Sequence, residues 1–317
     1  VETIYHFNSS ISLETLAVRE SGEVMVALDN FPIIYQIEPD SIHGSVRHIH
    51  TFEGCLVAHG IVEVEHDQFY VACSNLSVWT HVDVLGSPII LHLVKPACAK
   101  PGRLQHPARV DEVAHFPNSR IFTGMDVISK EKGLIYVGDS PLGIINILNV
   151  KTGHYFMAIN NSLTTVQPID STSGVYGIHL FQPKNNSTKY LYFSNWQEAL
   201  IARIPIHPNT GLPLGEPEVV VTNLTSVAEF ALDEEGNIFA ASFTLNQYVR
   251  IDHETKEVLV LAGDPDIDTY TQPLSVAFGR TESDKGDLYA VNNGGFTELH
   301  NVGAALFRLK LGDLAVV

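Results

Sequence analysis

Six times along the 317 residues, a short apolar segment is followed by a turn with Gly, Asp or Lys and then by a segment rich in Tyr, Phe and Val. Such alternating apolar segments predict β-strands, and each pair is followed by room for two more strands. The copies lie about 45 to 65 residues apart, and helical periodicity is almost absent, which is typical of propeller blades rather than of a solenoid. We therefore expect an all-β, six-bladed β-propeller with four strands in each blade. The paired segments are 15–19 with 22–29, 60–64 with 68–75, 124–128 with 133–140, 177–181 with 190–195, 230–233 with 236–243, and 275–279 with 287–293.

The two ends of the chain predict how the ring closes. After the strand at 305–310 only a short tail follows, so the sixth blade lacks a fourth strand, while residues 2–7 form a strand with no blade before it. Pairing the two would close the ring and remove an open sheet edge, which favours aggregation when exposed. We expect one domain over 1–317. The widest spacing between copies predicts an insertion at about 85–120, with a surface loop around Pro96, Pro101 and Pro107.

Composition excludes some functions. With 45% apolar and 17% charged residues, the chain has enough apolar residues for a packed core. A net charge of −17 argues against a phosphate-binding surface and therefore against nucleic-acid partners, because these need clustered Lys and Arg. No apolar run approaches the roughly 20 residues that span a bilayer.

The sequons and cysteines indicate the secretory pathway. Six Asn residues fit the N-glycosylation pattern Asn-x-Ser/Thr, and the chain opens at Val1, as after removal of a signal peptide. Cys55 lies just before a strand and Cys73 at the end of the strand expected to pair with it, so they form the favoured disulfide, with a bridge to Cys98 as the alternative. The six sequon residues are Asn8, Asn75, Asn160, Asn185, Asn186 and Asn223.

Several blade segments carry a family resemblance. The most specific are Tyr176-Gly-Ile-His with 190–195, Ala202-Arg-Ile-Pro-Ile with 215–220, and Glu229-Phe-Ala-Leu-Asp-Glu-Glu-Gly-Asn. With them the chain resembles, over essentially its whole length, the SMP-30/gluconolactonase/LRE-like propellers. It is most similar to a fungal branch that includes the hetero-Diels–Alderases of tropolone-sesquiterpene pathways in secondary metabolism.

The resemblance also implies where a metal would sit. Lactonases of this family hold a divalent cation on one Glu, two Asn and one Asp near the starts of the innermost strands. In this chain the matching positions are Glu14, Thr123, Tyr176 and the pair Ala228–Glu229. Thr and Tyr hydroxyls are poor substitutes for carboxylate and amide oxygens around a hard cation. We therefore expect no metal and no cofactor.

In a propeller, the starts of the inner strands and the ends of the second strands surround one mouth of the central channel. The residues at these positions, given at the end of this paragraph, are aromatic and apolar with a few polar side chains. Such a mixture is typical of small-molecule sites, and we expect a largely apolar cavity. His59, His179, Glu14, Glu229 and Trp196 each have an alternative role in packing or in bonding the backbone. The first set is Glu14, His59, Thr123, Tyr176, Glu229 and Leu274; the second is Asp29, Ser74, Asp139, Asn195, Trp196, Phe243 and Asn293.

Nucleophilic catalysis has little support, since the chain lacks a Gly-x-Ser-x-Gly elbow and a Cys-x-x-Cys motif. The resemblance implies instead a hetero-Diels–Alder cyclase that joins two small lipophilic substrates, a tropolone o-quinone methide and a humulene-type alkene. His59, Tyr176 or Thr123 would donate the catalytic hydrogen bond. Two alternatives stay open: a lactonase or esterase with a metal on Glu14 and Glu229, and a secreted propeller that binds a protein or a small ligand. The expected substrate-binding residues are Glu14, Met125, His179, Trp196, Glu229, Phe230, Phe243, Leu274 and Asn293.

Overall fold

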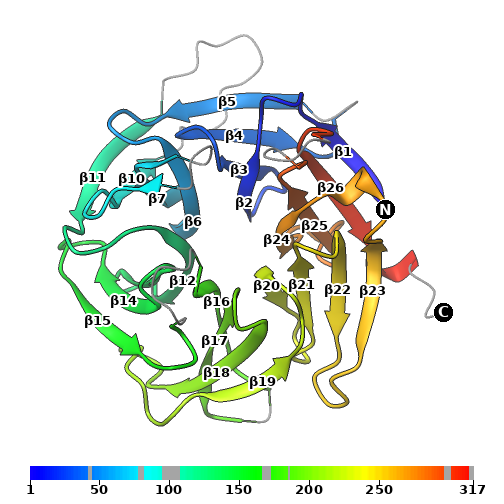
Figure 1. The fold of residues 1–317 in the computed structure, drawn as a ribbon. Coiled ribbons are helices and arrows are strands. Elements are labelled where there is room, and N and C mark those ends of the chain that lie inside the picture. The colour runs from blue at the N-terminus through cyan, green and yellow to red at the C-terminus, as the bar shows by residue number, and fades with distance from the viewer. Residues whose placement is uncertain are drawn as a thin grey trace.

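The computed structural model describes residues 1–41, 45–77, 82–94, 108–165, 173–184, 186–295 and 301–313. In these ranges the chain forms six four-stranded antiparallel sheets arranged around one axis (Figure 1). Only two short 3-10 helices accompany the strands of this described part, η1 (Asp268–Tyr270) and η2 (Leu311–Asp313). The predicted all-β, six-bladed propeller is therefore confirmed.

Blades are numbered here from the first inner strand, and within each blade the strands run from the axis outward. Blade 1 holds β2 (Leu13–Val18), β3 (Val24–Leu28), β4 (Ile33–Glu38) and β5 (Ser45–Thr51). Blade 2 holds β6 (Val57–Glu65), β7 (Gln68–Ser74), β10 (Ile89–Val94) and β11 (Arg109–His115). Blade 3 holds β12 (Phe122–Ser129), β13 (Leu134–Asp139), β14 (Ile144–Asn149) and β15 (Tyr155–Asn160).

The second half of the ring repeats this order. Blade 4 holds β16 (Val175–Phe181), β17 (Lys189–Asn195), β18 (Leu200–Ile206) and β19 (Glu218–Thr222). Blade 5 holds β20 (Val227–Leu232), β21 (Ile238–Ser242), β22 (Gln247–Ile251) and β23 (Val258–Gly263). Blade 6 holds β24 (Pro273–Phe278), β25 (Asp287–Asn292), β26 (Ala305–Lys310) and, outermost, β1 (Glu2–His6).

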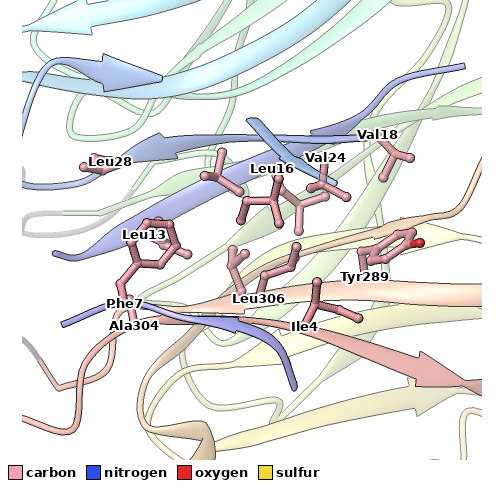
Figure 2. Packing of buried hydrophobic residues seen from close by; sticks show 13 residues of the cluster. Ile4, Phe7, Leu13, Leu16, Val18, Val24, Leu28, Tyr289, Ala304 and Leu306 are labelled. Carbon is pink, nitrogen blue, oxygen red and sulfur yellow. The ribbon is translucent and has the colours of Figure 1, made fainter. Parts of the chain in front are cut away.

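The N-terminal strand closes the ring as the sequence predicts. β1 pairs antiparallel with β26, so that Glu2 lies opposite Arg308 and His6 opposite Ala305. Figure 2 shows the core between blades 6 and 1, where Ile4 and Leu306 face the buried Leu16 of β2. Burying this apolar surface holds the first and last blades together, because it joins segments from both ends of the chain.

The range 85–120, where we expect an insertion, needs a correction. It contains β10 and β11, which pair with each other and are the two outer strands of blade 2, so these two segments belong to the blade itself. A small extra hairpin, β8 (Leu76–Ser77) with β9 (Val82–Asp83), lies instead between β7 and β10. Pro96, Pro101 and Pro107 lie outside the described residues.

Cys55 and Cys73 form a disulfide with their Cα atoms 5.9 Å apart, which is the pairing that the hairpin of β6 and β7 favours. Cys98 lies outside the described residues. Among the sequon residues, Asn8, Asn160, Asn186 and Asn223 are exposed and Asn75 is half-buried, while Asn185 is also outside the described part. No helix in the described ranges has the length and apolar character needed to cross a bilayer.

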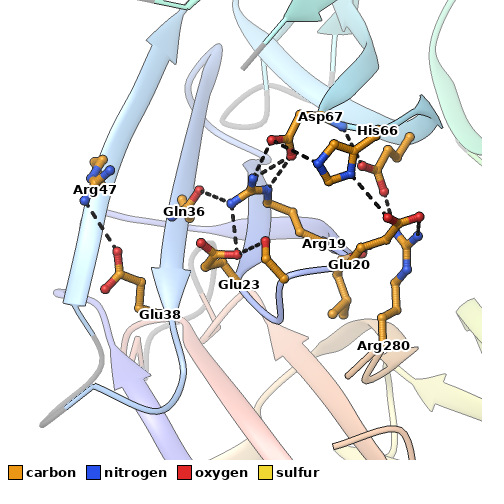
Figure 3. A network of polar contacts seen from close by, with 12 residues as sticks. Arg19, Glu20, Glu23, Gln36, Glu38, Arg47, His66, Asp67 and Arg280 are labelled. Carbon is orange, nitrogen blue, oxygen red and sulfur yellow. Dashed lines mark hydrogen bonds and ion pairs between the residues drawn. The ribbon is translucent and has the colours of Figure 1, made fainter. Parts of the chain in front are cut away.

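A polar network joins three blades at the ends of their inner strands (Figure 3). Arg280, in the turn after β24, donates to the Val18 carbonyl at 2.9 Å and to Glu20 of blade 1 at 3.0 Å, and it also bonds Glu63 of blade 2. Arg19 of blade 1 reaches Asp67 of blade 2 with N–O distances of 2.9 and 2.7 Å. The network therefore ties blades 6, 1 and 2 where the ring closes.

Candidate functional site

Every inner strand has an irregularity near its start. Pairing with the second strand shifts register at Glu14, at 59–60, at 123–124, at 176–177, at 228–229 and at Leu274. Such β-bulges re-aim a side chain and often occur beside active sites. The six channel positions that the sequence predicts are thus the bulge positions of the six blades.

Three glycines follow the channel residues of blades 2, 3 and 4. A Cβ on Gly60 would lie 2.6 Å from the Thr123 carbonyl oxygen, and a Cβ on Gly124 would lie 2.2 Å from that of Tyr176. On Gly177 it would come within 3.0 Å of a carboxylate oxygen of Glu229. Glycine is therefore required because the inner strands of neighbouring blades pack backbone against backbone at this level.

Tyr176 and Glu14 join opposite sides of the ring. The Tyr176 hydroxyl of blade 4 donates a hydrogen bond to Glu14 Oε1 of blade 1, and both residues are buried. The Thr123 hydroxyl donates to the Tyr176 carbonyl at 3.1 Å and so belongs to the same group. Burial raises the pKa of Glu14 to about 7, with His59 and the Tyr176 hydrogen bond opposing the shift. A large share of Glu14 is therefore protonated at neutral pH.

His59 and Asp29 lie beside Glu14. His59 Nε2 is 3.0 Å from Asp29 Oδ1, and one possible ligand atom from each of the three residues lies within 4.8 Å of the others. Burial lowers the pKa of His59, but Glu14 and Asp29 together outweigh it, so the net pKa is raised. Among the described residues, His59 Nδ1 has no hydrogen-bond partner. The pairing of Asp29 with His59 is a feature that sequence reasoning missed, because it joins blades 1 and 2.

A second acid–histidine pair lies further along β16. His179 Nε2 is 2.9 Å from Glu229 Oε2, and the His179 side chain is 30% exposed while that of Glu229 is 10% exposed. Burial lowers the pKa of His179, but Glu229 and Asp126 raise it above its usual value. Asp126 accepts the backbone N–H of Leu180 at 2.6 Å and thereby links β12 to β16. Nothing in the strand pattern around Asp126 distinguishes it, and sequence reasoning missed it.

Aromatic residues form the other side of the site. The Trp196 ring is 5.2 Å from that of Tyr176 and 4.7 Å from that of Phe243, measured between centroids. Leu274 belongs to the same apolar cluster. A pocket of about 390 Å³ adjoins Trp196 at the turns of blades 4 and 5. Its volume is at the low end of small-molecule sites.

Three expected substrate-binding residues have contacts within the protein itself. Phe230 is fully buried in the core between blades 4 and 5, and Met125 packs in the core between blades 2 and 3. Asn293 accepts the Gly295 N–H at 2.9 Å and so fixes a turn. The expectation of a largely apolar cavity also needs correction, because the bulges bring together the polar side chains of Glu14, His59 and Tyr176.

The four metal positions that the family resemblance implies do not present a converging set of ligands here. The Thr123 hydroxyl bonds a carbonyl, the Tyr176 hydroxyl bonds Glu14, and Glu229 pairs with His179. Glu14 and Glu229, the pair considered for a lactonase, are each engaged by another side chain, Glu14 by Tyr176 and Glu229 by His179. Three groups that can hold a cation do meet at Glu14, Asp29 and His59, which is a different set.

Comparison with known proteins extends these observations. No family model matches the sequence. A protein of Phoma sp. named "Putative hetero-Diels-Alderase" is 25% identical over 329 residues, covering 95% of this chain and 87% of the relative.

Solved structures show the same fold. A luciferin-regenerating enzyme matches with a TM-score of 0.65 and 15% identity over 94% of this chain and 90% of that chain. Regucalcin from Agrobacterium tumefaciens, a calcium-binding protein, matches with a TM-score of 0.62 and 14% identity over 97% and 92%. The resemblance indicated by the blade motifs is confirmed at the level of the fold: the chain has the same propeller fold as these two proteins, and its sequence is similar to that of a protein named as a hetero-Diels–Alderase.

Proposed function

We propose that the protein is a cyclase that needs no metal and joins a tropolone o-quinone methide to a humulene-type alkene by intermolecular hetero-Diels–Alder cycloaddition. The observation that carries the proposal is the buried hydrogen bond between Tyr176 and Glu14, next to the aromatic side chains of Trp196 and Phe243. It combines a proton donor with apolar surface, which are the two features that the reaction requires. The similarity to the Phoma protein supports the same reaction class.

The chemistry needs little from the protein besides position and polarisation. In the cycloaddition the C=C–C=O unit of the quinone methide and the C=C bond of the alkene form one C–C and one C–O bond. Three π bonds become one, and no atom leaves. Holding both partners together replaces a bimolecular encounter, and excluding water protects the quinone methide from hydration.

Glu14 and Tyr176 have distinct roles in this proposal. A protonated Glu14, with its pKa near 7, donates a hydrogen bond to the oxygen of the quinone methide and draws electron density from the heterodiene. Tyr176 holds the carboxyl group, and Thr123 fixes the backbone that carries Tyr176. Trp196, Phe243 and Leu274 provide the apolar side toward the alkene.

The direct test is incubation of the purified protein with a quinone-methide precursor and humulene. We expect the protein to raise the yield of cycloadduct and to select one stereoisomer. An E14Q variant, which keeps an acceptor for Tyr176 but lacks the acidic proton, should lose most of the rate increase. If yield and stereochemistry are the same with and without protein, the proposal fails.

A second candidate is a metal-dependent lactonase or esterase. It is favoured by one observation, the convergence of Glu14, Asp29 and His59 within 4.8 Å. Elemental analysis of the protein, with lactone hydrolysis measured before and after EDTA, separates the two. Stoichiometric Ca²⁺ or Zn²⁺ with EDTA-sensitive hydrolysis would favour the lactonase, whereas cycloaddition unaffected by EDTA would favour the cyclase.

We also propose that the protein passes through the secretory pathway and carries N-linked glycans. The exposure of Asn8, Asn160, Asn186 and Asn223 supports this, as does the Cys55–Cys73 disulfide, since disulfides persist in oxidising compartments. Treatment of the native protein with an N-glycosidase should lower its apparent mass, and an unchanged mass would contradict glycosylation.

A further inference from the structure

The pocket beside Trp196 is built from four segments of blades 4 and 5. Its lining residues are Ser173 before β16, then Trp196, Gln197 and Ala199 in the turn after β17, Thr225 and Ser226 before β20, and Thr244 after β21. The pocket adjoins the Tyr176–Glu14 group through Trp196, whose ring contacts that of Tyr176. None of these polar residues takes part in the contacts described for Tyr176, Glu14 and His59.

The backbone around this pocket has an unusual conformation. Ala199, Thr225 and Ser226 have φ angles of 52°, 44° and 46°, in the left-handed region that residues with a Cβ rarely adopt. For Ala199 the turn itself explains the angle, because Gly143 has a φ of 63° at the matching place of blade 3. Thr225 is different. Its counterpart before β24, Thr271, has a φ of −53°.

Neighbouring groups hold this conformation in place. The Ser242 hydroxyl donates to the Thr225 carbonyl at 3.2 Å, and the Phe243 N–H donates to the Ser226 carbonyl at 3.2 Å. The Leu224 N–H donates to the Ala199 carbonyl at 3.1 Å. A β-branched residue held in a disfavoured conformation by its surroundings is a feature that clusters at binding sites.

The polar side chains of the pocket are available for a ligand. Within the described part of the chain, the side chains of Gln197, Thr225, Ser226 and Thr244 make no hydrogen bond to protein. The side-chain amide of Asn195, at the same mouth of the central channel, is by contrast already bonded, because it donates to the carbonyls of Leu163 and Thr165. With the hydroxyl of Ser173, the pocket therefore offers four hydroxyls and an amide beside an indole ring.

We infer that this pocket binds a planar, conjugated ring that carries carbonyl or enol oxygens, with the ring against Trp196 and the oxygens toward Thr225, Ser226 and Thr244. Aromatic surface binds the face of such a ring, while hydroxyls both donate to and accept from its oxygens. The inference rests on the proposed function, because it identifies this pocket as the place where the tropolone half of the heterodiene is held. The oxygens bound here are those outside the heterodiene, whose own carbonyl oxygen and terminal carbon face Glu14 and the alkene.

Tropolone itself is the probe, since it binds without reacting, and isothermal titration calorimetry in EDTA-containing buffer measures its Kd. We expect wild type to bind tropolone and a T225A/S226A variant to bind it at least about tenfold more weakly, because two hydrogen-bonding groups are lost. K256A is the matched control, because Lys256 also has a left-handed φ of 62° but lies in the turn between β22 and β23. Thermal melts establish that each variant is folded, and W196F is a second variant that leaves the hydroxyls intact but weakens ring contact.

The outcomes separate this inference from the proposed function. Equal affinity in wild type, T225A/S226A and W196F, or no binding to wild type, overturns the inference. Tropolone binding that depends on these residues, without any cycloadduct, supports the pocket and removes the cyclase. Cycloaddition with an unchanged KM for the quinone-methide precursor in T225A/S226A supports the cyclase and overturns the pocket.

Discussion

Tyr176 donates its phenolic hydrogen bond to Glu14, although the strands that carry them, β16 and β2, lie on opposite sides of the ring (Figure 1). The two residues are 162 positions apart in the sequence. Each sits at a β-bulge, which re-aims its side chain. The bond brings an ionisable group and its donor together in a buried setting, and this is where the proposed chemistry is placed.

Replacing Tyr176 by Phe tests the role of this bond. Y176F keeps the ring that packs against Trp196 and removes the hydroxyl that positions Glu14. We expect cycloadduct formation to slow by about 10- to 100-fold, the effect of losing one oriented polar group. Product formation under saturating substrate is the measurement.

Y190F is the matched control for Y176F. Tyr190 lies on β17 of the same blade and contacts Arg203 through its ring, and no hydrogen bond of its hydroxyl is found in the described part of the chain. Its removal should leave the rate unchanged. Equal rates in Y176F and wild type would show that the Tyr176 hydroxyl has no part in the reaction.

The stability of the protein should fall as the pH rises from about 5 to 8. Burial raises the pKa of Glu14 from 4.5 to about 7, so the folded state binds this proton more tightly than the unfolded state does. The stabilisation is complete below the unfolded pKa and is lost as the pH rises through 7. Asp139, whose pKa burial raises to about 6, acts in the same direction, and the raised pKa of His59 does so too.

E14Q isolates the contribution of Glu14. The variant should be more stable than wild type at pH 8, by about 1 to 3 kcal/mol, and should show a flatter pH profile. Because Glu14 and His59 titrate as a pair, part of the slope should persist. Urea unfolding at pH 5, 6, 7 and 8 gives the comparison, and parallel profiles for the two proteins would show that Glu14 is not perturbed.

A methyl group at Gly124 should destabilise the fold strongly. In G124A the new Cβ would lie 2.2 Å from the Tyr176 carbonyl oxygen and 2.7 Å from the Ile178 backbone nitrogen, so blades 3 and 4 must separate. We expect a loss of about 3 kcal/mol or more in the free energy of unfolding. Gly286 is the control, since a Cβ there meets nothing within 4 Å. If chemical denaturation gave G124A and G286A the same stability, the close packing of inner strands would be disproved.

Arg280 should stabilise the ring closure. R280A removes contacts with the Val18 carbonyl, with Glu20 and with Glu63, whose side chain is only 7% exposed and would be left without this cation (Figure 3). A loss of about 1 to 2 kcal/mol is expected in urea unfolding. The exposed pair Lys184–Glu234 provides the contrast, and K184A should change stability by less than about 0.5 kcal/mol. Similar values for R280A and K184A would mean that the network adds nothing to closure.

The architecture could be predicted from the sequence because each blade is a local unit. The alternation of apolar residues in segments such as 22–29 and 133–140 specifies strands whatever lies around them. The closure of the ring could be predicted because residues 2–7 form a strand with no blade before it, while the last blade lacks a fourth strand after 305–310. Pairing the two removes an open sheet edge, which favours aggregation when exposed. Where the pattern weakened, as between residues 85 and 120, the prediction took β10 and β11 for part of an insertion.

Most residues of the candidate site could also be predicted from the sequence. The starts of inner strands and the ends of second strands mark the mouth, so Glu14, His59, Tyr176 and Trp196 were identified by position. Phe230 and Met125 are expected to contact substrate, and the structure places them in the apolar clusters between blades. Asp126 gave no signal, since its partner Leu180 is on another blade.

What the sequence determined by itself was the set of strands, their order and the residues at one end of the ring, because strand formation and turn chemistry act over a few residues. Only the tertiary structure decided which of those residues meet. Two of these contacts are the bond from Tyr176 to Glu14 and the pairing of His59 with Asp29, and each joins two different blades. A third is the pocket in which Thr225, with its left-handed backbone, lies beside Trp196 of the neighbouring blade. Such contacts depend on how bulges and close-packed backbones orient whole strands around the axis, and that geometry exists only once the ring has closed.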